Sequence, residues 1–466
     1  MSWTKNEILF ATAGKLLRAG RKNVFGEVVT DSSKVRTGSI FVALKGERLD
    51  GHRFVAEAVR RGARCVIVHR QPGRTGKNAT VIKVPDTLKA LGDLAHYRRG
   101  KLAPTVIAIT GSNGKTTTKE MLAAILEEAF LNGTALRGKV LKTEGNFNNL
   151  VGLPLTLLRL RQKHRVAVVE VGTNHPGEIR RLAQIADPDL GIVTSVAAAH
   201  LEGLSTLAGV AREKAALYRN VRPGGTIAVN LDDPWVRRLG QRFRGHKITY
   251  GKGGTVRAES WQSLGPKGIR FTLAAGRARC NVRLNYPGRH NVANAVGAAA
   301  LAHNLGVSLA AIRRGLERAR PFAMRMQIEE WQGVGIINDA YNANPASVEA
   351  AVKTLAEIRG QGERIAVLGD MFELGKQSRQ QHLKLGKRIA QYRLSGLYLL
   401  GAETTEQVRK GALRGGMPPE KIFVGKNHSD LARQLRRRVR KGDWLLLKGS
   451  RGMTMEKIVE KLKGRR

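Results

Sequence analysis

The stretch TVIAITGSNGKTTTKE, residues 105–120, decides how this chain is interpreted. An apolar run rich in β-branched residues stops at Gly111, a short polar loop follows, and a helix-forming segment begins at Lys115. In such a loop the backbone N–H groups and the helix N-terminus face one point and can bind phosphate oxygens. Lys115 would reach the outer phosphates, and Thr116 would be a ligand of Mg²⁺. The pattern therefore predicts a polyphosphate-binding loop, although Ile109 stands where the common GxxxxGK[ST] form has its first glycine.

Apolar strands and helical segments alternate after this loop. Strands are expected at 105–110, 166–172, 191–196 and 226–230. Buried β-branched strands separated by amphipathic helices indicate a doubly wound, mostly parallel sheet, as in P-loop ATPases. An antiparallel addition is expected at 255–263 and 268–275, followed by helices at 291–306 and 308–319.

Two further units flank this block, which ends at Pro321. The chain after Pro321 has a second alternating series that predicts a Rossmann-like open α/β domain, with strands at 335–341, 364–370, 396–401, 421–425 and 443–450. Before the block, strands at 39–44 and 63–69 flank a helix at 54–62, and the segment preceding Pro104 is expected to be a linker. We therefore predict a three-domain α/β protein, with domains at 1–100, 101–321 and 322–466. Ligands bind at the carboxyl ends of parallel strands in such sheets.

Composition places the chain among globular proteins of the cytoplasm. Hydrophobic residues make up 42% of it, and no apolar run reaches the roughly 20 residues that cross a bilayer. The N-terminal segment carries no export signal. The cysteines, Cys65 and Cys280, lie in strand-like runs and are expected to be buried, which argues against a disulfide or a cysteine metal site.

The charge is extreme. There are 81 lysines and arginines against 37 carboxylates, which gives a net charge of +44, and the densest basic run lies at 434–443. Such a field attracts polyanions. However, aromatic residues are only 5% of the chain, and no nucleic-acid-binding motif is present. Nucleic-acid binding is therefore not expected as the main function.

Candidate metal ligands follow the predicted strands. Glu170 ends one strand beside the loop, and His200 and Glu202 follow the next. Lys214 lies on a later helix. Each has an ordinary structural explanation when taken alone, but together at successive strand ends they outline one site around a nucleotide.

A set of further motifs resembles the Mur ligase family. These motifs occur in order from about Asp31 to Met455, and they are DSSKVRTGSIFVALKGERLDGHRFV, ITGSNGKTTTKE, TEGNFNNLVGLPLTLL, VEVGTNHPGEI, AHLEGL, GRHNVANAVGAAA, INDAYNANPASVEAA, VLGDMFELG and LLLKGSRGM. DAYNANP and LGDMFELG are the most specific, because the sister type that adds the third peptide residue usually carries DNPR and DYAHTP instead. Neither of those strings occurs here.

The resemblance implies an ATP-dependent ligase of peptidoglycan precursor synthesis. It implies that D-alanyl-D-alanine is joined to UDP-N-acetylmuramoyl-tripeptide through an acyl phosphate, with ATP and two Mg²⁺ ions, in a cytoplasmic and monomeric enzyme. Two alternatives stay open at this point. One is a relative that adds another amino acid, such as a folylpolyglutamate or cyanophycin-like ligase, and the other is a nucleic-acid-binding P-loop ATPase.

The resemblance also implies roles for individual residues. Lys115 would stabilise the transferring phosphoryl group, Thr116 and Glu170 would hold one Mg²⁺, and His200 would help to hold the second. Lys214 matches the family's carbamylated lysine. ATP would be bound by the phosphate loop, with Thr110, Gly111, Ser112, Asn113, Gly114, Lys115, Thr116 and Thr117. Further ATP contacts would be made by Asn291 and Asn294 at the adenine, by Arg325 at the phosphates and by Asp339 at the ribose.

Substrate contacts are implied in all three domains. The uridine diphosphate would be held by Ser32, Ser33, Lys45, Asp50 and His52, and the peptide by Thr143, Asn146 and Asn148. The carboxylate of the incoming dipeptide would be bound by Lys448, Ser450 and Arg451. Further substrate contacts would be made close to Asp339 by Tyr341, Asn342 and Asn344. Three positions depart from the family pattern. Ser33 replaces an arginine, Glu144 a proline, and Ala216 the glutamate of the usual AKGE sequence.

Overall fold

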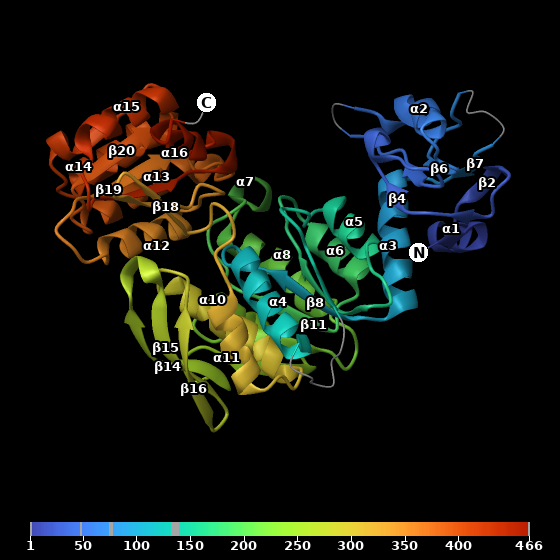
Figure 1. Ribbon diagram of the computed structural model, residues 1–466, viewed down its shortest axis with the longest axis horizontal. Coiled ribbons are helices and arrows are strands. Elements are labelled where there is room, and N and C mark those ends of the chain that lie inside the picture. Colours follow the sequence, from blue (N-terminus) through green and yellow to red (C-terminus); the bar gives the residue numbers. More distant parts are fainter. Residues whose placement is uncertain (1, 47–48, 74–77, 132–138, 465–466) are drawn as a thin grey trace.

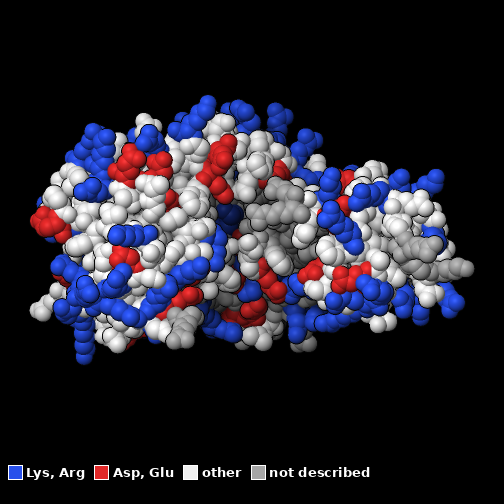
Figure 2. Space-filling view, turned by 90° about the horizontal axis from the view of Figure 1, so that it is seen from above, with Lys and Arg blue, Asp and Glu red and all other residues white. Residues whose placement is uncertain are grey.

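The computed structural model describes residues 2–46, 49–73, 78–131 and 139–464. Three α/β units lie in a row, with the N-terminal unit and the C-terminal unit on opposite sides of the central one (Figure 1). Lysine and arginine side chains are spread over the face in Figure 2, with scattered carboxylates between them, so the positive charge there is not confined to one stripe. None of the helices in the described parts of the chain is both long and apolar enough to span a membrane.

The N-terminal unit is built on a five-stranded sheet. Its strand order is β2 (Lys15–Arg18), β7 (Thr80–Lys83), β6 (Cys65–Val68), β5 (Ile40–Val42) and β4 (Val28–Val29). Only β2 is antiparallel to its neighbour. A separate antiparallel pair joins β1 (Trp3–Thr4) to β3 (Val24–Phe25), and the helices are α1 (Lys5–Thr12) and α2 (Val55–Arg60). Cys65 is buried here, as expected.

The expected linker before Pro104 is instead the end of a helix, α3 (Thr87–Leu102). The Asp86 carboxylate caps its start, accepting from the N–H groups of Leu88 and Lys89. Near its end, Arg99 is 2% exposed and its guanidinium lies 2.9 Å from the carboxylate of Asp189 in the central unit. Because the acceptors of this buried arginine belong to the central unit, the end of α3 is anchored to that unit.

The central unit contains a nine-stranded sheet. The strand order is β16 (Ala278–Leu284), β15 (Ile269–Ala275), β14 (Val256–Ser263), β13 (His246–Tyr250), β12 (Thr226–Asn230), β11 (Leu190–Val193), β8 (Thr105–Thr110), β10 (His164–Glu170) and β9 (Lys139–Lys142). The strands from β9 to β14 pair in parallel, and β14, β15 and β16 form the expected antiparallel addition. Cys280, on the edge strand β16, is only partly buried, contrary to expectation.

Helices cover the central sheet. They are α4 (Lys115–Leu131), α5 (Gly152–Leu158), α6 (Glu178–Ala186), α7 (Leu201–Leu204), α8 (Leu207–Arg219), α9 (Pro234–Gln241), α10 (His290–Asn304) and α11 (Leu309–Arg318). In the sheet register, Glu170 pairs with Ile109 and Val193 pairs with Thr110. The carboxyl ends of β8, β10 and β11 therefore meet at one edge, beside the phosphate loop.

The C-terminal unit is a six-stranded sheet. Its order is β17 (Gln327–Trp331), β18 (Val334–Asn338), β22 (Trp444–Lys448), β19 (Arg364–Gly369), β20 (Gly396–Leu400) and β21 (Ile422–Val424), with only β17 antiparallel. The helices are α12 (Pro345–Ala356), α13 (Ser378–Ala390), α14 (Arg409–Arg414), α15 (His428–Arg438) and α16 (Glu456–Leu462). This arrangement confirms the predicted Rossmann-like unit.

Candidate active site

The phosphate loop lies between β8 and α4. Gly111 and Gly114 have φ angles of 153° and 83°, in the region that favours glycine. A Cβ atom on Gly111 would lie 1.9 Å from the hydroxyl of Thr194, so no side chain fits there. Ser112 bonds to the next strand end, donating its N–H to the Ser195 carbonyl at 2.9 Å. The loop is thus fixed by its neighbours, with the amino end of α4 free to face an anion.

A partly buried lysine, Lys115, and a fully buried one, Lys214, lie beside this loop. Lys115 donates to the Gly111 carbonyl at 2.6 Å, and burial lowers its pKa to about 8. Lys214, on α8, is 0% exposed, and its Nζ atom has no hydrogen-bond partner among the described residues. Burial, and then the positive charge of Lys115, lower the pKa of Lys214 well below its usual value. The lowered pKa favours the neutral amine of Lys214 over its ammonium form.

Glu170 lies at the end of β10, where the strand pattern predicted it. Its side chain is 1% exposed; Oε2 accepts from the Asn148 amide at 3.4 Å, and Oε1 has no hydrogen-bond partner in the described chain. The Lys119 ammonium lies 3.5 Å from Oε1 as an ion pair and donates to the Thr143 carbonyl at 2.6 Å. Sequence reasoning missed Lys119, because its spacing on α4 alone does not show that it points toward β10.

The predicted peptide contacts lie along the same edge. Thr143 is fully buried, and its hydroxyl accepts from the Glu170 N–H at 2.9 Å, so both its hydroxyl and its carbonyl bond within the protein. Asn146 is exposed, and its carbonyl accepts from the Asn148 N–H at 2.7 Å. The departure at Glu144 is accommodated by an ion pair of 2.7 Å with Arg159.

His200 connects the central and C-terminal units. Its Nδ1 atom lies 2.6 Å from Oε2 of Glu373, in the loop after β19. The hydrogen bond from His200 holds the pKa of Glu373 below its usual range. Glu373 belongs to the motif VLGDMFELG, but its role was not predicted, because 173 residues separate the partners. Glu202, named as a neighbour of His200, donates its N–H to the Glu373 carbonyl.

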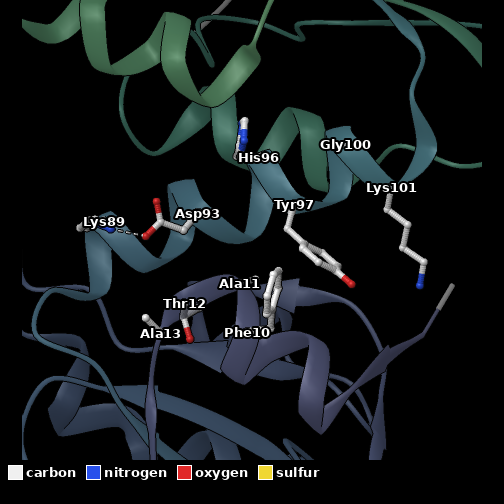
Figure 3. Close-up of a pocket in the computed structure, with 10 residues that line it drawn as sticks. All are labelled: Phe10, Ala11, Thr12, Ala13, Lys89, Asp93, His96, Tyr97, Gly100 and Lys101. Atoms are coloured by element: carbon white, nitrogen blue, oxygen red, sulfur yellow. Dashed lines mark hydrogen bonds and ion pairs between the residues drawn. The ribbon is translucent and has the colours of Figure 1, made fainter.

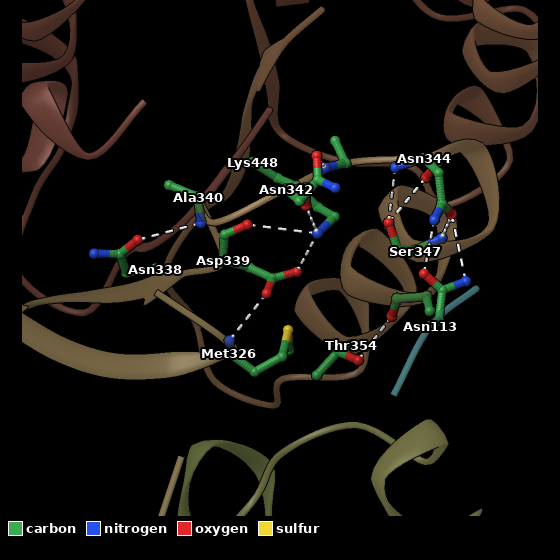
Figure 4. Close-up of polar contacts among 12 residues, drawn as sticks. Asn113, Met326, Asn338, Asp339, Ala340, Asn342, Asn344, Ser347, Thr354 and Lys448 are labelled. Carbon is green, nitrogen blue, oxygen red and sulfur yellow. Dashed lines mark hydrogen bonds and ion pairs between the residues drawn. The ribbon is translucent and has the colours of Figure 1, made fainter. Parts of the chain in front are cut away.

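Asn113 and Asn344 make a second contact between the same units (Figure 4). The Asn344 amide donates to Oδ1 of Asn113 at 2.7 Å, and the Asn113 amide lies 3.4 Å from Oδ1 of Asn344. Asn344 also caps α12 by accepting from the Ser347 N–H. The phosphate loop and the DAYNANP segment are thereby brought into direct contact.

Asp339 and Lys448 form a buried pair at the ends of β18 and β22 (Figure 4). The Lys448 ammonium lies 2.5 Å from Asp339 Oδ2 and 2.8 Å from the Asn342 carbonyl. The other Asp339 oxygen accepts from the Met326 N–H at 3.1 Å. Burial lowers the pKa of Lys448 despite the opposing charge of Asp339. Their predicted roles, at the ribose and at the dipeptide carboxylate, stay predictions, and in this arrangement each group has a protein partner.

A cleft of about 370 Å³ adjoins the phosphate loop. Asn291 and Asn294 lie in its wall on α10; the Asn294 amide donates to Asn291, and a Cβ atom on Gly114 would lie 2.2 Å from Asn294 Oδ1. Burial lowers the pKa of neighbouring His290 to about 4, so it is neutral. The cleft also contains Thr117, Arg325 and Asp339, so the structure brings the predicted adenine, phosphate and ribose residues together.

A narrower cleft of about 150 Å³ lies on the other side of the loop, between the central and C-terminal units. Its lining includes predicted residues from both, namely Ser112, Asn113, Lys115, Asn148, His200, Arg325, Tyr341, Asn342 and Asn344, together with Glu373. The Arg325 guanidinium lies over the Tyr341 ring at 4.1 Å, and its buried Nε has no hydrogen-bond partner among the described residues. Two cationic groups thus face the space where phosphate and acceptor would meet.

Ser450 and Arg451 lie beside this cleft. The Ser450 hydroxyl accepts from the Phe372 N–H at 2.8 Å, which fixes the loop that carries Glu373. Arg451 is exposed and pairs with Glu456 at 2.8 Å. Ser450 is thus buried in the structure, whereas Arg451 is accessible to a ligand.

The predicted uridine-diphosphate residues lie in the N-terminal unit, apart from these clefts. His52 is held at both ring nitrogens: Nδ1 lies 2.8 Å from Asp50 and Nε2 accepts from the His69 N–H at 3.1 Å. Lys45 pairs with Asp50 through a backbone bridge, and Ser33 donates to Asp31 at 2.7 Å. Ser32 lies 3.5 Å from Glu57. Asp50 and His52 therefore build the loop, although their ligand contacts stay predictions.

A separate hollow of about 610 Å³ lies between α1 and α3 (Figure 3). Its charged side chains pair within the protein: Lys89 lies 2.6 Å from Asp93, and Lys101 contacts Glu7. It contains none of the predicted site residues, and its geometry offers no group poised for chemistry.

No group of three or more histidine, cysteine, aspartate or glutamate side chains is arranged to hold a metal ion within the described ranges. A cation at the phosphate loop would thus depend on few protein oxygens, together with the phosphates themselves. Glu170 Oε1, which accepts no hydrogen bond within the described chain, and the buried Thr116, which is 4% exposed, fit that requirement.

Three α/β units around a phosphate loop, with clefts at their strand ends, define a nucleotide-using enzyme. The family models described as Mur ligase family, catalytic domain, Mur ligase middle domain and Mur ligase, glutamate ligase domain match residues 25–99, 109–302 and 324–451.

Individual relatives match over nearly the whole chain. The UDP-N-acetylmuramoyl-tripeptide–D-alanyl-D-alanine ligase of Haemophilus influenzae is 36% identical, over 95% of each chain. A crystal structure of MurF from Acinetobacter baumannii is 34% identical with a TM-score of 0.91, covering 100% of this chain and 99% of that one. MurF ligase from Thermotoga maritima, solved in complex with ADP, is 29% identical with a TM-score of 0.82, over 94% and 97%. The chain belongs to the Mur ligase family.

Proposed function

We propose that this enzyme joins D-alanyl-D-alanine to UDP-N-acetylmuramoyl-tripeptide, with cleavage of ATP to ADP and phosphate. The observation that carries the proposal is that two segments specific to this type of Mur ligase contact the central unit at the candidate site: DAYNANP bonds to the phosphate loop through Asn344 and Asn113, and Glu373 of LGDMFELG bonds to His200. Relatives of 36% identity over the full length bear the same activity in their names. We further propose that it acts as a cytoplasmic monomer.

The chemistry requires a poor electrophile to be activated. A carboxylate repels nucleophiles, and its oxygen is a bad leaving group, so transfer of the γ-phosphoryl group to the peptide carboxylate gives an acyl phosphate. The dipeptide amine then forms the C–N bond, and phosphate leaves with the C–O bond pair. The protein contributes positioning and charge neutralisation. Lys115 and Arg325 supply that positive charge where the two clefts meet.

The residues fit a magnesium ion at the loop. Thr116 and Glu170 would hold it, because Glu170 Oε1 is buried and lacks a hydrogen-bond partner in the described chain. When bound, Mg²⁺ would neutralise charge on the phosphates. Asn148 and Lys119 keep the Glu170 carboxylate in place. His200, oriented by Glu373, would help to hold a second ion near the acceptor carboxylate.

Lys214 fits carbamylation. A neutral amine can attack CO₂, forming an N–C bond and losing a proton, and the resulting carbamate offers oxygens instead of a cation. The buried, unpartnered Nζ of Lys214 supports this assignment. The glutamate of the family's AKGE sequence is replaced by Ala216. The neighbouring Glu213 does not substitute for it, because its carboxylate accepts from the N–H groups of Gly177 and Ile179 at 2.8 Å, at the start of α6.

The test is a ligation assay with purified enzyme. Without hydroxylamine, steady-state ATP consumption and product formation should require both the UDP-muramoyl-tripeptide and the dipeptide. When hydroxylamine replaces the dipeptide, it should trap the activated carboxylate as a hydroxamate. Using tripeptides ending in diaminopimelate and in lysine identifies the preferred third residue.

The alternatives have distinct outcomes in the same assay. ATP turnover with a folate and glutamate, or stimulation by DNA or RNA without the muramoyl peptide, would overturn the proposal. Absence of the hydroxamate in the presence of ATP and the muramoyl peptide would overturn the acyl-phosphate step.

A further inference from the structure

A groove of about 440 Å³ lies between α8 and α9, on elements that the proposed reaction does not use for substrate contact. Alanines of α8 and the partly buried Trp235, Leu239 and Phe243 give it apolar walls. Four exposed arginines complete the lining, and they are Arg212, Arg219, Arg238 and Arg242. A volume of a few hundred cubic ångströms with apolar walls and a few charged groups is typical of ligand sites.

These arginines lack acidic partners. No carboxylate within the described segments forms an ion pair with any of the four, and the Arg219 guanidinium reaches only the Arg212 carbonyl, at 3.4 Å. The nearest carboxylates in sequence are already used. Glu213 accepts from the N–H groups of Gly177 and Ile179. Asp233 caps α9 through the N–H groups of Trp235 and Val236 and accepts from the Val196 N–H. The guanidinium groups are thus available to an external anion.

The groove differs in this respect from other cavities of the described chain. The hollow at α1 and α3 contains Asp93, the nucleotide cleft contains Asp233 and Asp339, and a cavity of about 730 Å³ beside Trp261 contains Glu259 and Glu357. Only basic residues supply the charge of the α8–α9 groove. The positive charge of this groove is therefore not explained by the generally basic surface alone, because the other cavities named here also contain carboxylates.

We propose that the α8–α9 groove docks an acidic segment of a partner protein, in which carboxylates flank one or two apolar side chains. The carboxylates would pair with the four arginines, and the apolar side chains would enter between the alanines of α8 and Leu239. Arginine with tryptophan and tyrosine is the composition enriched where interfaces concentrate binding energy. Bidentate arginine–carboxylate pairs add geometric selectivity.

The groove suits a peptide better than the other polyanions. Base stacking needs free aromatic faces, but the Arg238 guanidinium lies 5.8 Å from the Trp235 ring centre and the Tyr218 hydroxyl is bonded to the Ala228 carbonyl. A membrane-binding surface projects its apolar groups outward, whereas here the apolar residues lie below an arginine rim. Both alternatives are outcomes of the test.

The test is a fluorescence-anisotropy titration of the full-length enzyme at about 0.15 M salt, where exposed charges are partly screened. The probe is a labelled peptide of aspartates and glutamates with a central leucine–phenylalanine pair, and its matched partner has two serines there. We expect the first peptide to bind and the second to bind at least about tenfold more weakly. The groove variant R212Q/R219Q/R238Q/R242Q should weaken binding of the first peptide by about tenfold or more.

The matched control variant, R270Q/R277Q/R409Q/R414Q, lacks four exposed arginines outside the groove. It should bind the first peptide as tightly as the unchanged protein does. Thermal unfolding checks that both variants are folded. A208W, which fills the groove without changing charge, should also weaken binding. Equal weakening by the groove and control variants, or equal binding of the two peptides, would overturn the proposal. So would binding of single-stranded DNA or anionic vesicles that depends on the groove arginines more strongly than binding of the peptide does.

Discussion

At the scale of single residues, the site depends on lysines whose environments differ sharply. Lys115 is partly buried beside the phosphate loop, and its pKa of about 8 lies near the pH at which enzymes are assayed. Lys448 is buried, and the carboxylate of Asp339 pairs with it. Lys214 has no hydrogen-bond partner in the described chain. One residue type thus occurs as a titratable cation, as a member of an ion pair and as an unpartnered amine whose neutral form is favoured, because burial and neighbours differ.

Lys115 predicts a pH dependence. Its charged form dominates below about pH 8 and is lost above it, and only the charged form neutralises phosphate. We expect kcat/KM for ATP to fall by about tenfold per pH unit above that point, since this parameter reports ionisation of the free enzyme. In Lys115→Arg the guanidinium stays charged, so the plateau should be lower but the alkaline fall should vanish. The same fall in the variant would show that another group titrates.

The proposed carbamylation of Lys214 can be tested by substitution and by ¹³C labelling. Lys214→Ala should reduce ligation by about 100-fold or more, as loss of a group supporting a metal does, and bicarbonate or short carboxylates should partly restore it. ¹³C-labelled bicarbonate should give a carbamate resonance in the unchanged enzyme only. Lys214→Arg is the matched control, because it keeps a cation but forms no carbamate. Near-normal activity of the alanine variant, or no resonance, would contradict the assignment.

At the scale of elements, local pattern predicted most strands and helices. β8, β10, β19 and β22 are continuous apolar runs, because both faces of a parallel sheet are covered by helices. The pattern does not predict β13, because its sequence HKITY begins with two polar residues, which are exposed in the structure. The strand also pairs with β14 at one position only. The local pattern predicts a linker at the end of α3, because the carboxylate of Asp189 that accepts from Arg99 lies 90 residues away in the sequence.

The site was predicted unevenly for the same reason. Glu170 and the loop lie at strand ends, which local sequence indicates. Glu373 and Lys119 act across the fold, so their partners are set by the sheet register and by the approach of two units. Pattern alone places such residues on an element but does not show what they face.

The glycine that precedes α4 in the phosphate loop, Gly114, leads to a prediction about loop stability and ATP binding. Gly114 and Gly253 have similar φ angles, 83° and 78°, so alanine costs about 1–2 kcal/mol of backbone strain at either. Only at Gly114 would the new Cβ lie 2.2 Å from Asn294, whereas nothing lies within 4 Å at Gly253. Gly114→Ala should therefore lower Tm more than Gly253→Ala does and should abolish ATP binding, which calorimetry measures. Equal effects of the two substitutions would show that the close approach of Asn294 to Gly114 does not matter for the loop.

At the scale of the whole molecule, we expect catalysis to need the central and C-terminal units to close on one another, because each carries part of the proposed site. Side-chain contacts join the two units at the clefts, Asn113 with Asn344 and His200 with Glu373. The second is charged when Glu373 is ionised, and His200 keeps its pKa low, so the contact persists at neutral pH and weakens only as acid protonates the carboxylate. Closure is thus coupled to a group that also orients a candidate metal ligand.

This coupling predicts that Glu373→Gln loosens closure without unfolding either unit. Small-angle scattering should show the unchanged enzyme compacting when ATP, Mg²⁺ and the muramoyl peptide are added, and the variant compacting less. KM for the substrates should rise about fivefold, which corresponds to the roughly 1 kcal/mol typical of a single hydrogen bond. Glu349→Gln is the control, because Glu349 pairs with Arg388 at 2.5 Å within the C-terminal unit alone. Compaction of the Glu373 variant equal to that of the control would show that this contact does not hold the units together, and no compaction of the unchanged enzyme would contradict closure itself.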